Sequence, residues 1–238
     1  MRRLFLADVH LSPREPSRTA RLGEFLRSEC RSGDELYILG DLFDYWIGPK
    51  HLDLADYEEA LAMLRQAARD GVCLFFILGN RDFYMMGDGF EQKTGIRVVD
   101  GRVEHRLVVG SKSVYLCHGD YLEGRTDRGF AIQEKIRSAE FERKFVRLPA
   151  RVAKGMAEFY RWLSGRKARR PNRPSREAVL AQFRRGADII VCGHYHVPRT
   201  ETYVVDGREA ILYILGDWSE GLSYLAEEDG RWLLRPGQ

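Results

Sequence analysis

The chain has 238 residues, of which 44% are hydrophobic and 31% are charged, and this is enough apolar material for a large core. The composition excludes an intrinsically disordered chain and a fibrous one. No uninterrupted apolar run approaches the roughly 20 residues that a membrane-spanning helix needs. Asp8 and His10 interrupt the apolar stretch near the start, so we expect no secretory signal.

The four cysteines fit a protein that stays in the cytosol. No two of them have the C-x-x-C spacing that marks a thiolate zinc site or a redox pair. We therefore expect buried, reduced and inert thiols. The cysteines are Cys30, Cys73, Cys117 and Cys192.

The formal net charge of +3 conceals a strong asymmetry. Residues 125–185 contain 18 Lys and Arg against six Asp and Glu, a net charge of +12, so the rest of the chain carries −9. The basic residues are densest over 161–185. Such a run is compatible with a solvated surface, or with binding of an anionic substrate, an anionic membrane surface or nucleic acid. Composition does not choose among these.

Six short apolar runs predict β-strands. They are rich in Ile, Val, Leu, Phe and Tyr and are bounded by Gly or Asp. Their length and their lack of alternation favour strands that are buried on both faces. The runs are Leu4–Ala7, Leu36–Leu39, Cys73–Leu78, Val114–Cys117, Ile189–Cys192 and Ile211–Leu215.

Two helices are predicted between the first three strands. One covers about Thr19 to Glu29. The other begins after Asp56, which we expect as its N-cap, and stops at Gly71. Strands that alternate with helices in this way indicate a layered α/β fold.

A helical pattern replaces the strand pattern from Phe130 onward. A stripe of apolar residues recurs at steps of three and four, which is the spacing of one helix face, and Pro149 is expected to end one helix and open the next. Two interpretations are open: these helices pack on the sheet, or they form a helical lobe inserted between the fourth and fifth predicted strands. The stripe consists of Phe141, Phe145, Leu148, Val152, Met156, Phe159 and Leu163.

Polar side chains follow five of the predicted strands at the point where each strand ends. Because the carboxyl ends of strands in an open α/β sheet meet at one crevice, we expect these blocks to converge. The blocks are Asp8-Val9-His10, Gly40-Asp41, Gly79-Asn80-Arg81-Asp82, His118-Gly119-Asp120 and Gly193-His194-Tyr195-His196.

These blocks offer carboxylate, imidazole and carboxamide groups without a thiolate, which suits Mn²⁺, Zn²⁺ or Fe²⁺. Taken singly, each His, Asp or Asn has an ordinary structural explanation as a turn former or a helix cap. Five blocks in order make coincidence a poor explanation, and His51 and His105, which lack such a setting, are interpreted as structural. The seven candidate ligands are too many for one tetrahedral ion and predict two ions with a bridging carboxylate, as in phosphoester hydrolases. They are Asp8, His10, Asp41, Asn80, His118, His194 and His196.

The order Asp-x-His, Gly-Asp, Gly-Asn, His-Gly-Asp, Gly-His-x-His resembles the calcineurin-like metallophosphoesterases. The resemblance implies a four-layered α/β/β/α sandwich. It also implies one metal ion held by Asp8, His10, Asp41 and His196, and a second held by Asp41, Asn80, His118 and His194. Asp41 would bridge the two ions.

A narrower resemblance rests on Leu36 to Gly48 and on Gly79-Asn80-Arg81-Asp82-Phe83, which look like the UDP-2,3-diacylglucosamine pyrophosphohydrolases of lipid A biosynthesis. That family cleaves UDP-2,3-diacylglucosamine to UMP and 2,3-diacylglucosamine 1-phosphate, usually with Mn²⁺. The resemblance implies a cytoplasmic enzyme that is peripheral to the inner face of the inner membrane. It also implies an inserted helical cap, here 125–185 within a single domain of 1–238, that holds the acyl chains.

Arg81 stands where many relatives place a histidine that acts as a general acid. An arginine does not donate its proton at neutral pH but clamps phosphate oxygens in a bidentate manner, so a phosphate leaving group, which needs no acid, fits this site. The alternative is a salt bridge from Arg81 to Asp82 or to another carboxylate. The resemblance assigns substrate contacts to Asn80, Arg81, His194 and, with one inserted residue, Asp127.

We therefore expect a dinuclear hydrolase acting on a glycolipid nucleotide, with two divalent ions, Mn²⁺ first among them, and with an anionic membrane surface as its partner. One alternative is a general phosphodiesterase or nucleotide pyrophosphatase with a smaller soluble substrate. Another is a non-catalytic binder that uses the basic segment on nucleic acid or lipid. Nucleic acid is not the expected partner, because the segment lacks the interleaved aromatic residues of single-strand readers. A monomer and an oligomer both remain open.

Overall fold

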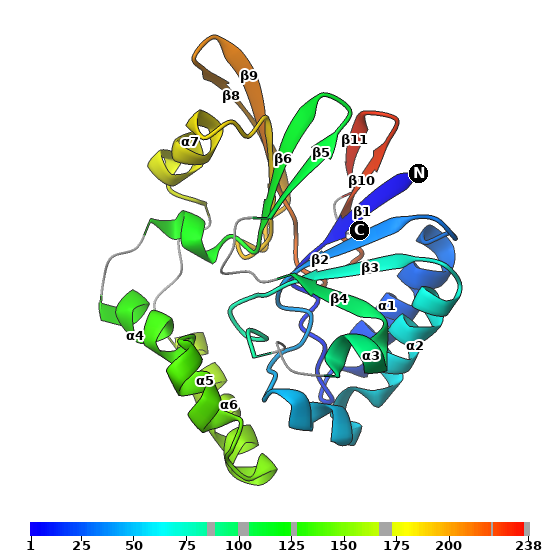
Figure 1. The fold of residues 1–238 in the computed structure, drawn as a ribbon, viewed down its shortest axis with the longest axis vertical. Helices are drawn as coiled ribbons and strands as arrows, with labels where there is room; N and C mark the ends of the chain where they lie inside the picture. Colours follow the sequence, from blue (N-terminus) through cyan, green and yellow to red (C-terminus); the bar gives the residue numbers. More distant parts are fainter. Residues whose placement is uncertain (85–88, 100–104, 125–127, 167–172, 220, 236–238) are drawn as a thin grey trace.

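A computed structural model describes residues 1–84, 89–99, 105–124, 128–166, 173–219 and 221–235 (Figure 1). Two β-sheets dominate these residues. The first has the strand order β11-β10-β1-β2-β3-β4, and the second has the order β5-β6-β7-β9-β8. The strands of the first sheet are β1 Arg2–Leu6, β2 Glu35–Leu39, β3 Cys73–Ile77, β4 Ile96–Val99, β10 Tyr224–Glu228 and β11 Arg231–Arg235. Those of the second are β5 His105–Val109, β6 Lys112–Cys117, β7 Ile189–Cys192, β8 Arg199–Val205 and β9 Arg208–Ile214.

The two sheets face each other across a shared apolar layer, because successive side chains in a strand point to opposite faces. In β1, Phe5 lies in the cluster between the sheets, whereas Leu4 and Leu6 lie in the cluster on the outer face. In β7, Val191 faces the first sheet and Ile190 faces outward. Both faces of these strands are therefore buried, as the continuous apolar runs predict.

Helices cover the outer face of each sheet. Leu22 and Phe25 of α1 and Leu64 of α2 lie in the outer cluster of the first sheet, and Figure 1 shows α1, α2 and α3 along that sheet. Val179 and Phe183 of α7 bury against the second sheet. This order of helix, sheet, sheet and helix is the expected α/β/β/α sandwich. The helices are α1 Pro16–Glu29, α2 Glu58–Arg69, α3 Phe90–Thr94, α4 Arg128–Ile136, α5 Ala139–Phe145, α6 Ala150–Arg166 and α7 Arg176–Arg184, with short 3₁₀ turns η1 Pro49–Asp53, η2 Ala55–Tyr57 and η3 Asp120–Glu123.

All six predicted strands are confirmed, and the structure adds five that sequence analysis missed: β4, β5, β8, β10 and β11. Two of the missed hairpins carried a recognisable signal. Asp206-Gly207 joins β8 to β9 and Asp229-Gly230 joins β10 to β11, with positive φ at all four residues, which is typical of type I′ hairpin turns.

The two helices predicted between the first strands are also confirmed as α1 and α2, and Gly71, with φ +94°, follows the end of α2. The prediction that Asp56 caps α2 is wrong. Asp56 belongs to η2, and Tyr57 precedes α2 without a side-chain cap. The Asp56 carboxylate instead accepts hydrogen bonds from the Tyr45 hydroxyl at 3.0 Å and from Lys154 Nζ at 2.7 Å.

The apolar stripe of 141–163 does not form one continuous face. The helices break at Pro149 as predicted, with α5 ending at Phe145 and α6 starting at Ala150. The stripe residues of α5 and those of α6 therefore do not lie on one continuous helix face. Phe145 is buried, but Val152, Met156 and Phe159 of α6 are 49%, 43% and 60% exposed. Leu163 belongs to the stripe in sequence, but its side chain lies outside the described residues.

The cysteines are all free, as expected, but not all are buried: Cys192 is buried, Cys30 and Cys117 are half-buried, and Cys73 is exposed. Cys73 is exposed because it is the first residue of β3, at the open amino end of that strand. None of the described helices combines the length and the apolar composition that crossing a bilayer requires.

Glycines at the strand ends let loops from the two sheets touch. A Cβ added to Gly193, just after β7, would lie 2.4 Å from Ala7 Cβ and 2.5 Å from Asp8 Oδ2. We therefore predict that Gly193→Ala lowers the free energy of unfolding by about 1–3 kcal/mol or more, as overpacking does.

Gly155 of α6 is the matched control, because a Cβ added there meets nothing within 4 Å. Gly155→Ala should raise stability by roughly 0.5–1 kcal/mol through helix propensity. Urea unfolding of both variants measures the difference, and equal stabilities would show that the close approach at Gly193 is unimportant.

Candidate functional site

The structure brings all seven candidate ligands to the carboxyl ends of β1, β2, β3, β6 and β7. Six are at most 8% exposed, and the His196 side chain is 40% exposed. The loops are tied together by their backbones: Asp8 N donates to Gly40 O at 3.2 Å, and Gly193 N donates to His118 O at 2.8 Å. These backbone hydrogen bonds fix the loops that carry the candidate ligands relative to one another.

The backbone of these loops is strained. Among the described residues, seven non-glycine residues have positive φ, and five of them are candidate ligands, Asp8, His10, Asp41, His194 and His196, with φ between 51° and 73°. Such conformations cost about 1–3 kcal/mol each and cluster at functional sites, where the surrounding structure enforces them. The other two are the hairpin residues Asp206 and Asp229.

The first group of ligand atoms comes from Asp8, His10 and His196. His10 Nε2 lies 3.4 Å from His196 Nε2, and Asp8 Oδ1 lies 3.8 Å from the former and 3.5 Å from the latter. One ligand atom from each of the three residues lies within 4.8 Å of the others, as a shared ion would require.

The second group surrounds His118. Its Nε2 lies 3.3 Å from Asn80 Oδ1, 3.2 Å from His194 Nδ1 and 3.6 Å from Asp41 Oδ1. Asp41 also approaches the first group, with its Oδ2 3.9 Å from His10 Nδ1. The Asp41 carboxylate thus lies between the two groups.

The buried polar atoms of the site fit a bound cation. Asp8 Oδ1 is buried beside the first group and accepts no hydrogen bond from the described residues, although burial of an unpaired polar atom is unfavourable. His118 Nδ1 lies 2.9 Å from Leu39 O. A carbonyl only accepts, so Nδ1 carries a proton and the neutral ring turns the Nε2 lone pair toward Asn80 and His194. A divalent ion with imidazole and oxygen ligands fits this set.

The pKa shifts of the histidines reflect both their burial and the negative charge of the carboxylates in the site. Burial lowers the pKa of His118, but the Asp41 and Asp8 charges outweigh it and raise that pKa. Burial also opposes protonation of His196, yet the nearby Asp217 and Asp8 carboxylates raise its pKa to about 10. For His10 burial dominates and lowers the pKa to about 3, so this ring is a neutral donor.

Arg81 lies at the rim of the site and pairs with carboxylates other than Asp82. Its Nη1 donates to Asp44 Oδ1 at 3.0 Å, and its Nε lies 3.4 Å from Asp41 Oδ2. Asp44 Oδ2 also accepts from Arg161 Nη1 of α6 at 2.6 Å. One buried carboxylate therefore holds a guanidinium from the core loop and another from α6.

Asp82 organises the loops instead of pairing with Arg81. Its carboxylate accepts from the backbone N–H groups of Asp41 and Gly79 at 3.1 Å each and from that of Phe43 at 3.2 Å. Burial and the nearby Asp41 charge raise the pKa of Asp82 to about 7, against the effect of these hydrogen bonds. This fully buried side chain fixes the two loops that carry Asp41 and Asn80.

Several residues at the site escaped the sequence analysis. Glu123 Oε1 lies 2.6 Å from His194 Nε2, and Asp217 Oδ2 lies 3.5 Å from His196 Nδ1. The only sequence signal was position: Glu123 follows the His118 block by three residues, and Asp217 follows the last predicted strand. Asp44 lay within a quoted motif but received no role.

Two predicted assignments need separate comment. Asp127 lies outside the described residues. His51 is structural, as interpreted, because it is fully buried and stacks on Trp46.

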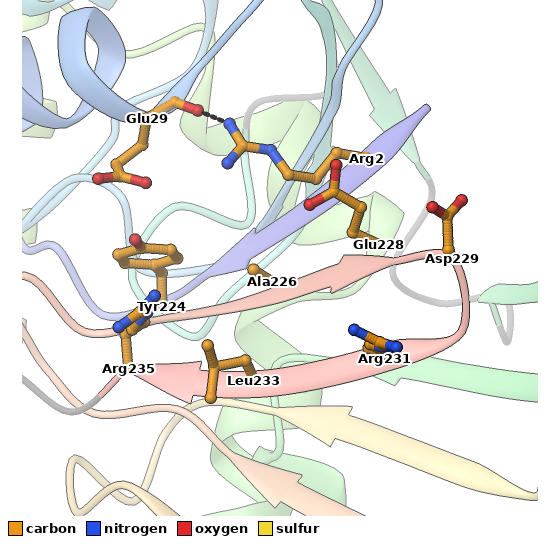
Figure 2. Close-up of a pocket in the computed structure, with 9 residues that line it drawn as sticks. All are labelled: Arg2, Glu29, Tyr224, Ala226, Glu228, Asp229, Arg231, Leu233 and Arg235. Atoms are coloured by element: carbon orange, nitrogen blue, oxygen red, sulfur yellow. Dashed lines mark hydrogen bonds between the residues drawn. The ribbon is translucent and has the colours of Figure 1, made fainter.

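A hollow of about 520 Å³ lies away from the site, on the face of β10 and β11 (Figure 2). It includes Arg2 at the amino end of β1, whereas Asp8 follows the carboxyl end of the same strand, and none of its lining residues is a candidate ligand. It is not part of the site. Its lining residues are Arg2, Glu29, Tyr224, Ala226, Glu228, Asp229, Arg231, Leu233 and Arg235.

Comparisons with known proteins agree with this geometry. The family model of the calcineurin-like phosphoesterases matches residues 1–198. A UDP-2,3-diacylglucosamine hydrolase from Edwardsiella ictaluri is 34% identical over 228 residues, covering 92% of this chain and 85% of that protein. Another from Vibrio cholerae is 33% identical over 233 residues, covering 94% of each chain.

Asp82 yields a stability prediction. Asp82→Ala leaves three buried N–H donors without their acceptor, and each such donor costs about 1–3 kcal/mol, so we expect the free energy of unfolding to fall by at least about 3 kcal/mol. Asp53→Ala is the control: Asp53 is 73% exposed and, among the described residues, pairs with Lys93 alone, so its loss should change stability by less than about 0.5 kcal/mol. If the two variants have similar free energies of unfolding in urea, Asp82 does not stabilise these loops.

Proposed function

The chain belongs to the calcineurin-like phosphoesterase family and, within it, to the UDP-2,3-diacylglucosamine hydrolases, and we propose that it cleaves the pyrophosphate bond of UDP-2,3-diacylglucosamine to give UMP and 2,3-diacylglucosamine 1-phosphate. It is a metal-dependent hydrolase. The observation that supports the proposal is a pair of adjoining ligand groups, Asp8 with His10 and His196, and Asp8 with Asp41 and His118. The Arg81 guanidinium lies beside them, with its Nε 3.4 Å from Asp41 Oδ2. Such a paired site suits attack on a phosphorus atom.

Two divalent ions, for which we propose Mn²⁺, would supply Lewis-acid stabilisation of phosphoryl oxygens and a reactive water when bound. Asp8, His10, Asp41 and His196 are the proposed ligands of one ion. Asp41, Asn80, His118 and His194 are those of the other. The proposal is supported by the buried Asp41 carboxylate, which lies between His10 and His118, and by the tautomer of His118, which directs its Nε2 lone pair inward.

Arg81 is proposed to bind the phosphoryl oxygens. Its guanidinium is already oriented by Asp44 at 3.0 Å and is 24% exposed, so it is reachable from solvent. A planar guanidinium suits bidentate contact with phosphate. Because a phosphate monoester leaves without needing a proton from a general acid, an arginine at this position supports pyrophosphate cleavage over cleavage of an alkyl ester. Asn80, His194 and Asp127 remain the further proposed substrate contacts.

Residues 125–185 are proposed to form a cap that meets the acyl chains and the membrane. The exposed Val152, Met156 and Phe159 of α6, with Ile132 of α4 at 58% exposure, support contact with apolar material. The net charge of +12 over this segment supports attraction to an anionic bilayer, which is expected to weaken as salt rises. We propose a peripheral location on the inner face of the inner membrane.

The proposed substrate is tested by comparing acylated with deacylated UDP-glucosamine. Each buried methylene contributes about 0.8 kcal/mol, so burial of only three should raise kcat/KM for the acylated substrate by roughly 50-fold. Purified protein with Mn²⁺ is assayed on both substrates and on simple phosphodiesters. Equal rates on the acylated and deacylated forms would instead favour a general nucleotide pyrophosphatase.

Arg81→Ala tests the phosphate contact. Loss of one charge-assisted contact is worth roughly 1.5–3 kcal/mol, so kcat/KM should fall about 10- to 150-fold. Stability should change little, because Arg161 still neutralises Asp44 at 2.6 Å, and the metal content should also be retained.

Arg65→Ala is the matched control, since Arg65 forms a surface pair with Glu58 away from the site. An Arg81→Ala protein that unfolds at lower urea concentration but keeps full specific activity would assign Arg81 a purely structural role.

A further inference from the structure

A buried carboxylate stands directly behind one candidate ligand. Glu123 Oε1 lies 2.6 Å from His194 Nε2, and each side chain is only 4% exposed. Glu123 is the last residue of η3, whose first residue, Asp120, follows the His118-Gly119 pair. The short segment 118–123 therefore contains one candidate ligand, His118, and the carboxylate that contacts another, His194.

The contact determines which nitrogen of His194 faces the site. An ionised carboxylate only accepts hydrogen bonds, so Nε2 carries the proton and Nδ1 of the neutral ring keeps its lone pair. Nδ1 lies 3.2 Å from His118 Nε2, whose lone pair points to the same place because His118 Nδ1 bonds to Leu39 O. Two lone pairs at this distance repel unless a proton or a metal ion lies between them.

From this geometry we propose that Glu123 is a positioning residue for the second ion: it fixes the ring orientation and the tautomer of His194, so that the Nδ1 lone pair faces that ion. The inference rests on the dinuclear site proposed above. Outer carboxylates that hold a metal-ligating histidine typically contribute 10- to 100-fold to metal affinity.

The first group of ligands has a weaker counterpart. Asp217 Oδ2 lies 3.5 Å from His196 Nδ1, and these side chains are 24% and 40% exposed. The longer, more exposed contact should orient His196 less firmly. In this proposal Glu123 supports one ion and Asp217 supports the other. A variant of Glu123 and a variant of Asp217 therefore serve as controls for each other.

The test measures Mn²⁺ binding to the full chain by isothermal titration, together with the spin-coupled paramagnetic resonance signal of a Mn²⁺ pair. Glu123→Ala should weaken the second of the two bound ions by 10- to 100-fold and should remove the coupled signal at limiting Mn²⁺. Glu123→Gln, which keeps an acceptor oxygen but loses the charge, should fall between Glu123→Ala and the wild type.

Two further variants identify the ion that is affected. His118→Ala should remove the same ion as Glu123→Ala, whereas Asp217→Asn should leave that ion in place and affect only the other. Thermal unfolding of the metal-free proteins separates loss of affinity from loss of structure.

Wild-type affinity at both sites in Glu123→Ala and Glu123→Gln would overturn the inference, as would an equal loss at both sites that tracks a lower metal-free melting temperature. A wild-type chain that binds fewer than two ions would overturn the proposed dinuclear site, and this inference with it. Two ions in the wild type with unaffected variants would leave the proposed function intact and reject only the role of Glu123.

Discussion

Backbone contact between the loops that follow the central strands is the constraint on which the site depends. A Cβ on Gly40 would lie 2.5 Å from Gly79 Cα, and His10 N donates to Asp41 O at 2.9 Å. Loops this close leave no room for independent movement, and Asp82 further joins them by accepting three backbone hydrogen bonds. The positions of all the candidate ligands are therefore coupled through the backbone before any ion binds.

This coupling explains how a strained and highly charged site is sustained. Five candidate ligands have left-handed backbone conformations, which together oppose folding by roughly 5–15 kcal/mol. The opposing stabilisation comes from the apolar layers on both faces of β1 and β7, such as Phe5 and Val191 between the sheets. The loops themselves hold a surplus of hydrogen-bond acceptors. A bound cation would satisfy Asp8 Oδ1, which accepts no hydrogen bond from the described residues, so metal binding and folding stability are thermodynamically linked.

Sequence analysis predicted the central strands and the grouping of the polar blocks because both follow from short-range rules. An apolar run bounded by Gly reveals a strand, and the carboxyl ends of such strands meet. The supporting residues Glu123, Asp217 and Asp44 follow no such rule, because an acidic residue in a loop shows no periodicity and its partner lies far away in the chain. The assignment of Asp56 as a helix cap failed for the same reason: its real partner, Lys154, is 98 residues distant.

Helix α6 reverses the usual distribution of large and small apolar residues. Its packed face consists of Ala150, Ala153 and Ala157, which contact the core cluster, whereas the larger Val152, Met156 and Phe159 share a face that is largely exposed. Folding alone would favour burying the larger side chains.

The alanine face allows α6 to approach the core closely enough for Arg161 to reach Asp44 at 2.6 Å and, through it, Arg81. The same helix therefore presents apolar side chains to the outside and a guanidinium to the site. The proposed substrate, with its charged pyrophosphate and its long acyl chains, would match these two features of α6.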